Sequence, residues 1–371
     1  MKNLILILII MMTACSPKDP KPEFPYTAAD FESVTDGANT ALYTLRNDNG
    51  MVVTLTNYGA KIVSILVPDR SGFLADVMLG FKSIDDYKQF SASHGATVGP
   101  FANRIGNGTF AIGDSVYQLE KNNGNNTLHS GSVNYARRVW SALQEGNSVV
   151  MHLESPDGEY GFPGNRAVTV KFTLTAENEL KIDYHATTDQ PTHMNLTNHG
   201  YFNLRGEGNG DILAHVVVIN ADSITAVDEG MIPTGELLSV KDTPLDFNQP
   251  RPVGENIDAD HPHLQMGAGY DFNYVIDKPV GELGFAASAY EPESGRYMEV
   301  FTTEPGVQLY SGNHLRGNEI GKSGVAYTKR TGICFETQHY PDSPNKPDFP
   351  STLLLPGEPL VSTTIYKFSV Q

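Results

Sequence analysis

The sequence predicts an all-β protein, a large antiparallel β-sandwich with few short helices. Apolar and polar residues alternate with a period of two in 168–174 and 180–187, which predicts two strands that each bury one face. In addition, 35 glycines and 23 prolines divide the 371-residue chain into short segments. Strand and helix patterns do not alternate along the chain, so a parallel α/β sheet is not expected. Together these observations favour an antiparallel sandwich or barrel.

The predicted elements follow in order along the chain. The two runs above are separated by a short polar turn and form one predicted hairpin. Residues 51–56 and 61–67 flank a turn at 57–60 and form a second. The best helix candidate is 84–89, and the proline-rich stretch 241–269 is interpreted as a long excursion across the sheet. Further strands are predicted at 215–219, 296–301 and 362–370.

The N-terminus is typical of a targeting segment. Residues 1–14 form a predicted lipoprotein signal peptide, in which the apolar run 4–12 is too short to span a bilayer. Small residues precede Cys15, as in bacterial lipoproteins whose cleavage leaves a lipidated cysteine; an ordinary secretory signal is the alternative. Residues 15–29 are a predicted proline-rich tether, and 30–371 a single domain. We therefore expect a lipid-anchored protein of the bacterial cell envelope, on its periplasmic or cell-surface side.

The net charge argues against one class of partner, and the two cysteines bear on whether a disulfide can form. The formal net charge is −17 and no Lys/Arg cluster is present, which argues against a nucleic-acid partner. The expected membrane contact is the N-terminal lipid alone, and the oligomeric state is left open. If Cys15 carries lipid, Cys334 has no partner for a disulfide within the chain. Cys334 lies in an apolar stretch, which predicts a buried thiol.

Two polar segments about 140 residues apart suggest proton transfer on a hydroxyl-rich ligand. The segment 195–204 contains His199, and the segment 336–345 begins with Glu336. Each places one ionisable side chain among amides, hydroxyls and aromatic rings. Histidine and glutamate are readily tuned to act as acid and base near neutral pH. If the segments meet in space, an enzyme acting on a sugar is predicted.

Four further clusters supply candidate sugar-binding residues. Asn103 and Arg104 follow a small-residue stretch, and the guanidinium fork suits two neighbouring sugar oxygens, although a structural ion pair is equally compatible. His129 lies in a turn, where a surface histidine is the alternative. Asp271 stands among aromatic residues, the usual composition of a sugar subsite. Gln308 offers one amide in a strand-like stretch, which by itself is weak evidence.

Taken together, these segments resemble the aldose 1-epimerase family, the galactose mutarotases. The motifs occur in the family's order: Asn103-Arg-Ile, Leu128-His, Thr197-Asn-His-Gly-Tyr-Phe-Asn-Leu, Gly269-Tyr-Asp, and Glu336-Thr-Gln-His-Tyr-Pro-Asp-Ser-Pro-Asn. The resemblance covers nearly all of the chain from about Asp30. It implies a galactose mutarotase-like supersandwich with an open cleft on one sheet.

The resemblance also implies roles for individual residues. Glu336 would be the general base and His199 the general acid. Four residues would bind the sugar and a fifth, Asn103, would be a further contact; the four are Arg104, His129, Asp271 and Gln308. Two positions depart from the family pattern: Pro100 stands where Arg is frequent and Phe272 where His is frequent. Both departures place sugar preference, not reaction type, in doubt.

The implied reaction interconverts the α and β anomers of a free aldohexose such as galactose or glucose. Glu336 would take the proton from O1 while protonated His199 gives one to O5, and no metal or other cofactor is required. For this role His199 should stay protonated near neutral pH.

Four alternatives remain. A non-catalytic cell-surface sugar-binding or sensing protein would not need the His199–Glu336 pair. A glycoside hydrolase would use Asp271 with Glu336. A metal site could form on His261 and His263, although no third ligand is evident. An enzyme for phosphorylated sugars would need more basic residues than Arg104.

Overall fold

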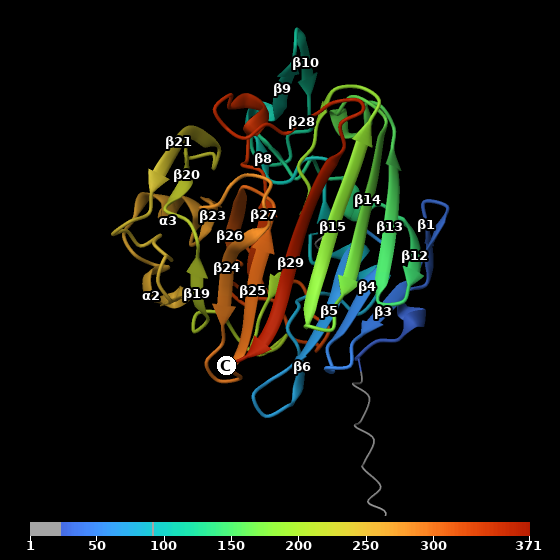
Figure 1. Cartoon of the computed structure of the whole chain (residues 1–371), viewed down its shortest axis with the longest axis vertical. Coiled ribbons are helices and arrows are strands. Elements are labelled where there is room, and N and C mark those ends of the chain that lie inside the picture. Colours follow the sequence, from blue (N-terminus) through green and yellow to red (C-terminus); the bar gives the residue numbers. More distant parts are fainter. Residues whose placement is uncertain (1–23, 91–92) are drawn as a thin grey trace, which may run out of the picture.

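The computed structural model describes residues 24–90 and 93–371, and its main feature is a large antiparallel sheet (Figure 1). The predicted signal peptide, Cys15 and the first part of the predicted tether lie outside the described residues. The large sheet runs, in spatial order, through β12 (Ser141–Glu145), β13 (Ser148–Ser155), β14 (Arg166–Leu174), β15 (Glu179–Thr188), β29 (Leu360–Val370), β25 (Arg296–Thr302), β24 (Gly284–Tyr290), β19 (Val216–Ile219) and β22 (Arg251–Pro252).

Two smaller sheets complete the main architecture. A six-stranded sheet has the order β18 (Tyr201–Phe202), β27 (Ile333–Gln338), β26 (Gly306–Tyr310), β23 (Asp271–Val275), β20 (Ser223–Val227) and β21 (Pro233–Ser239). A four-stranded sheet has the order β3 (Leu42–Arg46), β4 (Val52–Thr56), β5 (Lys61–Pro68) and β6 (Leu74–Asp76). The strands within each of these three sheets pair antiparallel over the described residues.

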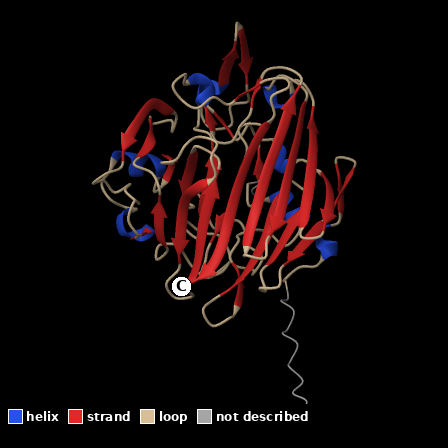
Figure 2. Cartoon of the chain, in the orientation of Figure 1, coloured by secondary structure: helices blue, strands red, loops and turns tan. Residues whose placement is uncertain are grey.

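Short strand pairs and helices lie around these sheets (Figure 2). The strand pairs are β1 (Ser33–Thr35) with β2 (Ala38–Thr40), β7 (Thr97–Val98) with β17 (Thr197–Asn198), β8 (Arg104–Ile105) with β11 (Thr127–Leu128), β9 (Thr109–Ile112) with β10 (Ser115–Gln118), and β16 (Thr192–His193) with β28 (Leu353–Leu354). The α-helices are α1 (Ile84–Gln89), α2 (Val253–Asn256) and α3 (Pro262–Gly267). Within the described ranges, no helix has the length and apolar character needed to cross a membrane.

The predicted all-β antiparallel fold is confirmed, and its best-defined strands follow from the period-two pattern. In β14 the apolar positions are buried while the intervening residues are largely part-exposed, and the strand pairs with β15 as the predicted hairpin. The second predicted hairpin is β4 with β5, which are buried along almost their whole length. Helix α1 has the predicted bounds, and Ser83 caps it by accepting a hydrogen bond from the backbone of Asp86.

The core lies between the sheets. Val170 of β14, Phe335 of β27 and Tyr366 of β29 belong to one buried cluster. The hydroxyl of Tyr366 donates to the backbone carbonyl of Phe335 at 3.1 Å, which ties the large sheet to the six-stranded one. As a result, the odd-numbered face of β27 is fixed against the core, and its even-numbered face points the other way.

In the described part of the predicted tether, Phe24 and Tyr26 pack against the rest of the chain. Phe24 stacks on Tyr26 with ring centroids 5.1 Å apart. The Tyr26 hydroxyl lies 2.8 Å from that of Thr54 and donates to that of Ser64 at 2.7 Å. Packed structure therefore begins before the predicted domain start at residue 30.

The excursion predicted at 241–269 contains β22, α2 and α3. Its apolar residues Phe247, Val253 and Leu264 are buried in the main core cluster. This stretch therefore covers apolar surface beside the edge of the large sheet, where β22 pairs with β19.

Candidate active site

One face of the six-stranded sheet gathers the polar residues that the sequence analysis singled out. Gln308 on β26 lies directly opposite Glu336 on β27, and on its other side opposite Asn273 on β23. Asp271 lies two residues before Asn273 and therefore on the same face of its strand. Neighbouring strands in register thus bring residues far apart in the chain into one buried polar surface.

Glu336 and His199 meet on this surface, as the two polar segments predicted. Oε1 of Glu336 lies 3.6 Å from Nε2 of His199, and the two side chains are only 3% and 6% exposed. Oε2 of Glu336 is buried and has no hydrogen-bond partner among the described residues. A buried carboxyl oxygen without a partner is costly, so this atom is available to a ligand hydroxyl.

Burial shifts the pKa values of these two groups in opposite directions. It raises the pKa of Glu336 well above the ordinary 4.5, and the nearby carboxylate of Asp271 adds to the increase. It lowers the pKa of His199 to about 4, although a hydrogen bond with its own backbone acts in the other sense. These directions place the proton of the unliganded pair on Glu336. The expectation that His199 by itself stays protonated near neutral pH is therefore wrong for the unliganded site.

His199 is held by a loop between β17 and β18. Its backbone N–H donates to Ala96 and its carbonyl accepts from Gly95, both at 2.9 Å. An uninterrupted strand would place His193 and Asn195 on the same face as His199. The strand is instead interrupted: His193 contacts Thr352, and Asn195 bonds the backbone of His339. These two residues position chain segments and do not join the site.

Asp271, Arg104 and Gln308 form one linked group. Gln308 donates through Nε2 to Oδ1 of Asp271 at 2.6 Å, and Arg104 donates through a terminal nitrogen to Oδ2 at 3.4 Å. The Nε of Arg104 also donates to Asn123 at 3.3 Å. Both carboxylate oxygens of Asp271 are therefore engaged, while remaining guanidinium donors of Arg104 are free to bind sugar oxygens.

His129 and Asn103 lie in tight turns beside the pair. Both residues have a positive φ, 53° for His129 and 63° for Asn103. The backbone N–H of Asn103 donates to Nδ1 of His129 at 3.1 Å, so the neutral ring carries its proton on Nε2. Burial holds the pKa of His129 well below its usual range, which keeps the ring neutral. The ring of His129 meets that of His199 edge-on at 5.3 Å, whereas the Asn103 side chain accepts from the backbone of Arg104.

Two amides behind this group were not assigned a role from the sequence. The Nε2 of Gln338 donates to Asn273 at 3.2 Å and to Oε1 of Gln308 at 3.4 Å. Both Gln338 and Asn273 are almost completely buried. They extend the chain of hydrogen bonds from Gln308 into the protein and orient its amide. Gln338 lies two residues after Glu336 on β27, and Asn273 lies two residues after Asp271 on β23, so each shares a strand face with a predicted site residue. This spacing of two was the signal that could have identified them.

Aromatic rings form the remaining walls around His199. Tyr201 stacks on His199 with centroids 4.8 Å apart, and Tyr310 meets it edge-on at 6.4 Å. On its far side Tyr201 stacks on His94 at 4.4 Å. The thiol of Cys334 lies 3.6 Å from Nδ1 of His199, and Cys334 is fully buried as predicted.

The residues His129, His199 and Glu336 have ligand atoms within 4.8 Å of one another, which makes a metal site worth testing. A metal ligand must offer a lone pair toward the ion. The hydrogen bond from Asn103 to Nδ1 leaves Nε2 of His129 protonated, so this nitrogen donates instead. The trio therefore suits an oxygen acceptor on a sugar better than a cation. In the described part of the chain, His261 and His263 belong to no such group of three.

The two departures from the family pattern have different surroundings. Phe272 lies between Asp271 and Asn273 on β23 and therefore points to the opposite face, where it is fully buried in the core. It does not contact the polar surface, so its side chain cannot select sugar hydroxyls directly. Pro100 is buried, and its carbonyl accepts from the backbone of Asn195 at 2.8 Å.

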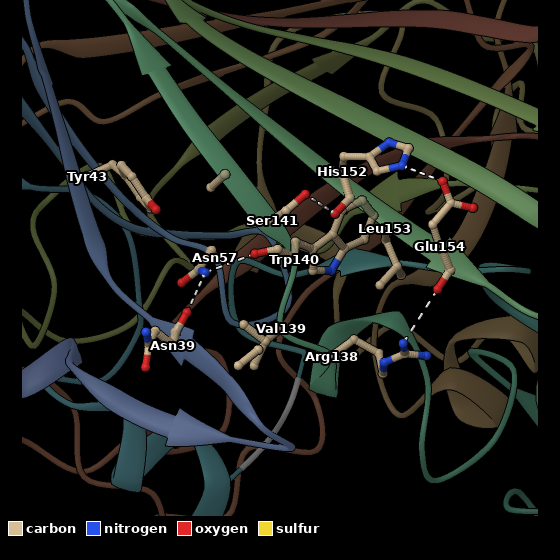
Figure 3. A pocket seen from close by; sticks show the side chains of 12 residues that line it. Asn39, Tyr43, Asn57, Arg138, Val139, Trp140, Ser141, His152, Leu153 and Glu154 are labelled. Atoms are coloured by element: carbon tan, nitrogen blue, oxygen red, sulfur yellow. Dashed lines mark hydrogen bonds and ion pairs between the residues drawn. The ribbon is translucent and has the colours of Figure 1, made fainter.

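A cavity of about 540 Å³ lies away from this site, beside the edges of the four-stranded and nine-stranded sheets (Figure 3). Its polar groups mostly bond one another: Asn57 donates to the carbonyl of Trp140, and His152 pairs with Glu154. It does not contain a buried acid–base pair, so the surface around Glu336 remains the candidate active site.

The sequence and the fold of this chain are similar to those of known proteins. The sequence pattern of the aldose 1-epimerase family matches residues 41–367. The galactose mutarotase of Bos taurus is 42% identical over 345 residues, covering 93% of this chain and 98% of that protein. The aldose 1-epimerase of Escherichia coli K12 is 37% identical over 336 residues, covering 90% and 96% respectively.

Two solved structures share the fold and confirm the predicted galactose mutarotase-like sandwich. An aldose epimerase homologue from C. elegans has a TM-score of 0.82 at 30% identity, covering 89% of this chain and 99% of that one. A galactose 1-epimerase from Lactobacillus acidophilus has a TM-score of 0.80 at 28% identity, covering 91% and 97%. From the extent of the family pattern and the near-complete coverage of its relatives, this chain belongs to the aldose 1-epimerase family.

Proposed function

We propose that this protein interconverts the α and β anomers of a free aldohexose by acid–base ring opening, with Glu336 and His199 moving the protons. The observation that carries the proposal is the buried pair itself: Oε1 of Glu336 lies 3.6 Å from Nε2 of His199, while Oε2 has no partner among the described residues. A pure sugar-binding surface has no need of an acid–base pair held out of water.

The reaction needs one proton on the pair. When a sugar binds, transfer of that proton from Glu336 to His199 produces a carboxylate and an imidazolium. Glu336 then accepts the proton of O1 as the imidazolium of His199 donates to O5, which opens the ring. Rotation about C1–C2 and the reverse transfers yield the other anomer. Each positioned proton transfer is worth roughly 10²–10⁴ in rate.

The neighbouring residues bind and orient the sugar in this proposal. His129 donates from Nε2, and Arg104 supplies guanidinium donors. Asp271 and Gln308 bind hydroxyls from one side of the sheet. The Asp271 carboxylate lies beside Arg104 and compensates its charge, which favours a neutral sugar over a phosphorylated one.

Replacement of Glu336 by Gln tests the proposal directly. Polarimetry on fresh α-D-galactose and α-D-glucose should show rapid catalysed mutarotation by the wild-type protein and only the uncatalysed rate with Glu336→Gln. Sugar binding measured by calorimetry should persist in the variant. A variant that keeps wild-type activity would remove Glu336 from the mechanism.

The names of the relatives support galactose as a substrate. NMR exchange spectroscopy on a panel of free aldoses would rank galactose against glucose and other sugars. Sugar binding without anomer exchange for any member of the panel would favour a sensing protein. Release of sugar from aryl glycosides would favour a hydrolase.

We further propose that the protein is anchored to the bacterial envelope through lipid on Cys15. The support is the sequence of residues 1–15 alone. In a bacterial host the full chain should fractionate with membranes, and Cys15→Ser should not be processed to the lipidated form. Mass spectrometry of the mature N-terminus would identify an unmodified Cys15 if the proposal were wrong.

A further inference from the structure

The two histidines of the site differ in the group that faces Nδ1. Nδ1 of His129 faces the backbone N–H of Asn103 at 3.1 Å. Nδ1 of His199 faces the thiol of Cys334 at 3.6 Å. The first partner can only donate a hydrogen bond, whereas a thiol can donate through S–H or accept at sulfur.

This difference decides which protonation states each ring can adopt. A donor-only partner excludes a proton on Nδ1, so His129 is restricted to the neutral form with its proton on Nε2. The sulfur of a thiol can accept from Nδ1–H of neutral His199, which leaves Nε2 free to take the proton of Glu336, and it can accept in the same way from the imidazolium. A carboxylate in the same place would carry a negative charge and would favour the protonated ring.

The thiol itself remains protonated and has a fixed place. Burial raises the pKa of Cys334 well above its usual range, and the nearby carboxyl of Glu336 adds to the increase. Cys334 lies on β27 directly opposite Tyr201 on one side and Tyr310 on the other. It therefore lies in the same sheet that positions Glu336, two residues along the strand and on the same face.

The neighbouring aromatic rings and Glu336 contact other parts of the His199 ring. Tyr201 and Tyr310 contact the ring through their faces and edges, and Glu336 faces Nε2. The titratable groups near His199 are Glu336, Cys334, Tyr310, Tyr201, His129 and, beyond Tyr201, His94.

We propose that Cys334 is a positioning residue that holds the imidazole of His199 through Nδ1 in both of its protonation states. In the neutral state Nδ1–H donates to sulfur, and the lone pair of Nε2 faces Glu336 and can take its proton. In the cationic state Nδ1–H donates to sulfur and Nε2–H is presented to the sugar ring oxygen. No bond is made or broken at sulfur. The inference rests on the proposed role of His199, but its main test does not depend on activity.

That test observes the ring directly. In ¹⁵N-histidine-labelled protein, long-range ¹H–¹⁵N spectra distinguish Nδ1–H from Nε2–H in His199, with His199→Asn used to assign its signals. The wild type should show the Nδ1–H form when neutral. Cys334→Ala should convert it to a mixture of tautomers, and Cys334→Ser, which keeps a group able to donate and accept, should preserve it.

Kinetics provide a second readout. Loss of one modest hydrogen bond predicts that Cys334→Ala lowers kcat about three- to tenfold with little change in KM, and that Cys334→Ser recovers most of the loss. Ile333→Val is the matched control, because Ile333 is buried on the same strand but faces the core. It should leave both kcat and the His199 tautomer unchanged.

An unchanged His199 tautomer in folded Cys334→Ala would overturn the inference, even if activity fell. Equal losses of kcat in Cys334→Ala and Ile333→Val would also overturn it, because they would indicate a packing effect. Absence of mutarotation in the wild-type protein would instead refute the proposed function, while the tautomer comparison would still be decisive for Cys334.

Discussion

Oε1 of Glu336 lies 3.6 Å from Nε2 of His199 in a place from which solvent is almost wholly excluded. Burial raises the pKa of the carboxyl and lowers that of the imidazole, so each group alone favours its neutral form. At this separation the two titrate as a coupled pair, and the number of protons on the pair matters more than the assignment to either residue. The form with one proton is the one that can open a sugar ring.

The pH dependence of kcat/KM should therefore be bell-shaped and broad. The acid limb should lie near the lowered pKa of His199, about 4, where a second proton joins the pair. The alkaline limb should lie well above pH 4.5, the ordinary pKa of a glutamate, at the pH where the last proton leaves the pair. Polarimetric rates corrected for the uncatalysed reaction at each pH measure this profile. A single acid limb near 6.5, the ordinary value for histidine, would contradict it.

Glu336→Gln should be more stable than the wild type at neutral and alkaline pH. The folded-state pKa of Glu336 is raised, so its stabilising contribution is complete below about 4.5 and is lost as pH rises through the folded value. Gln does not titrate, and the free energy of unfolding of the variant should exceed that of the wild type by a margin that grows with pH. Urea unfolding at pH 5 and pH 8 measures it.

The matched control for this measurement is Glu358→Gln, because Glu358 is exposed to solvent. Its stability relative to the wild type should be the same at both pH values. If the free energy of unfolding of Glu336→Gln relative to the wild type were also the same at pH 5 and pH 8, the buried carboxyl would not carry the predicted cost.

Gln338→Leu should weaken sugar binding with little effect on chemistry. Gln338 donates to Oε1 of Gln308, and Gln308 in turn donates to Asp271. Without the first bond the amide of Gln308 is free to rotate, and KM should rise about two- to tenfold while kcat stays nearly constant. Gln144→Leu, on exposed strand β12, is the control. A fall in kcat with unchanged KM would place Gln338 in the proton-transfer step instead.

Phe272→Leu should reduce stability without changing sugar preference. Phe272 is fully buried on the core face of β23, so the substitution should lower the free energy of unfolding by about 0.5–3 kcal/mol. The ratio of kcat/KM for galactose to that for glucose should remain that of the wild type. A changed ratio at unchanged stability would mean that the core face of β23 influences the site after all.

Much of the fold could be predicted from local sequence, since a period of two in 168–174 and 180–187 gives a buried face only if these segments are strands. The bounds of α1 could be predicted because Ser83 is a favourable cap. The breaks in the strand pattern between His193 and His199 could not be predicted from local sequence, because they depend on hydrogen bonds to distant segments at Ala96 and Thr352.

The sequence by itself determined the strand pattern and the identity of the chemically active side chains, because residue type and spacing are local properties. It also placed Glu336 and His199 at the centre of the function. Only the tertiary structure decided the face of Phe272, the network behind Gln308 and the thiol at Nδ1 of His199. These depend on the register between β23, β26, β27 and β18, which is set by core packing across the whole chain. Burial, which follows from the same packing, shifts the two pKa values in opposite directions.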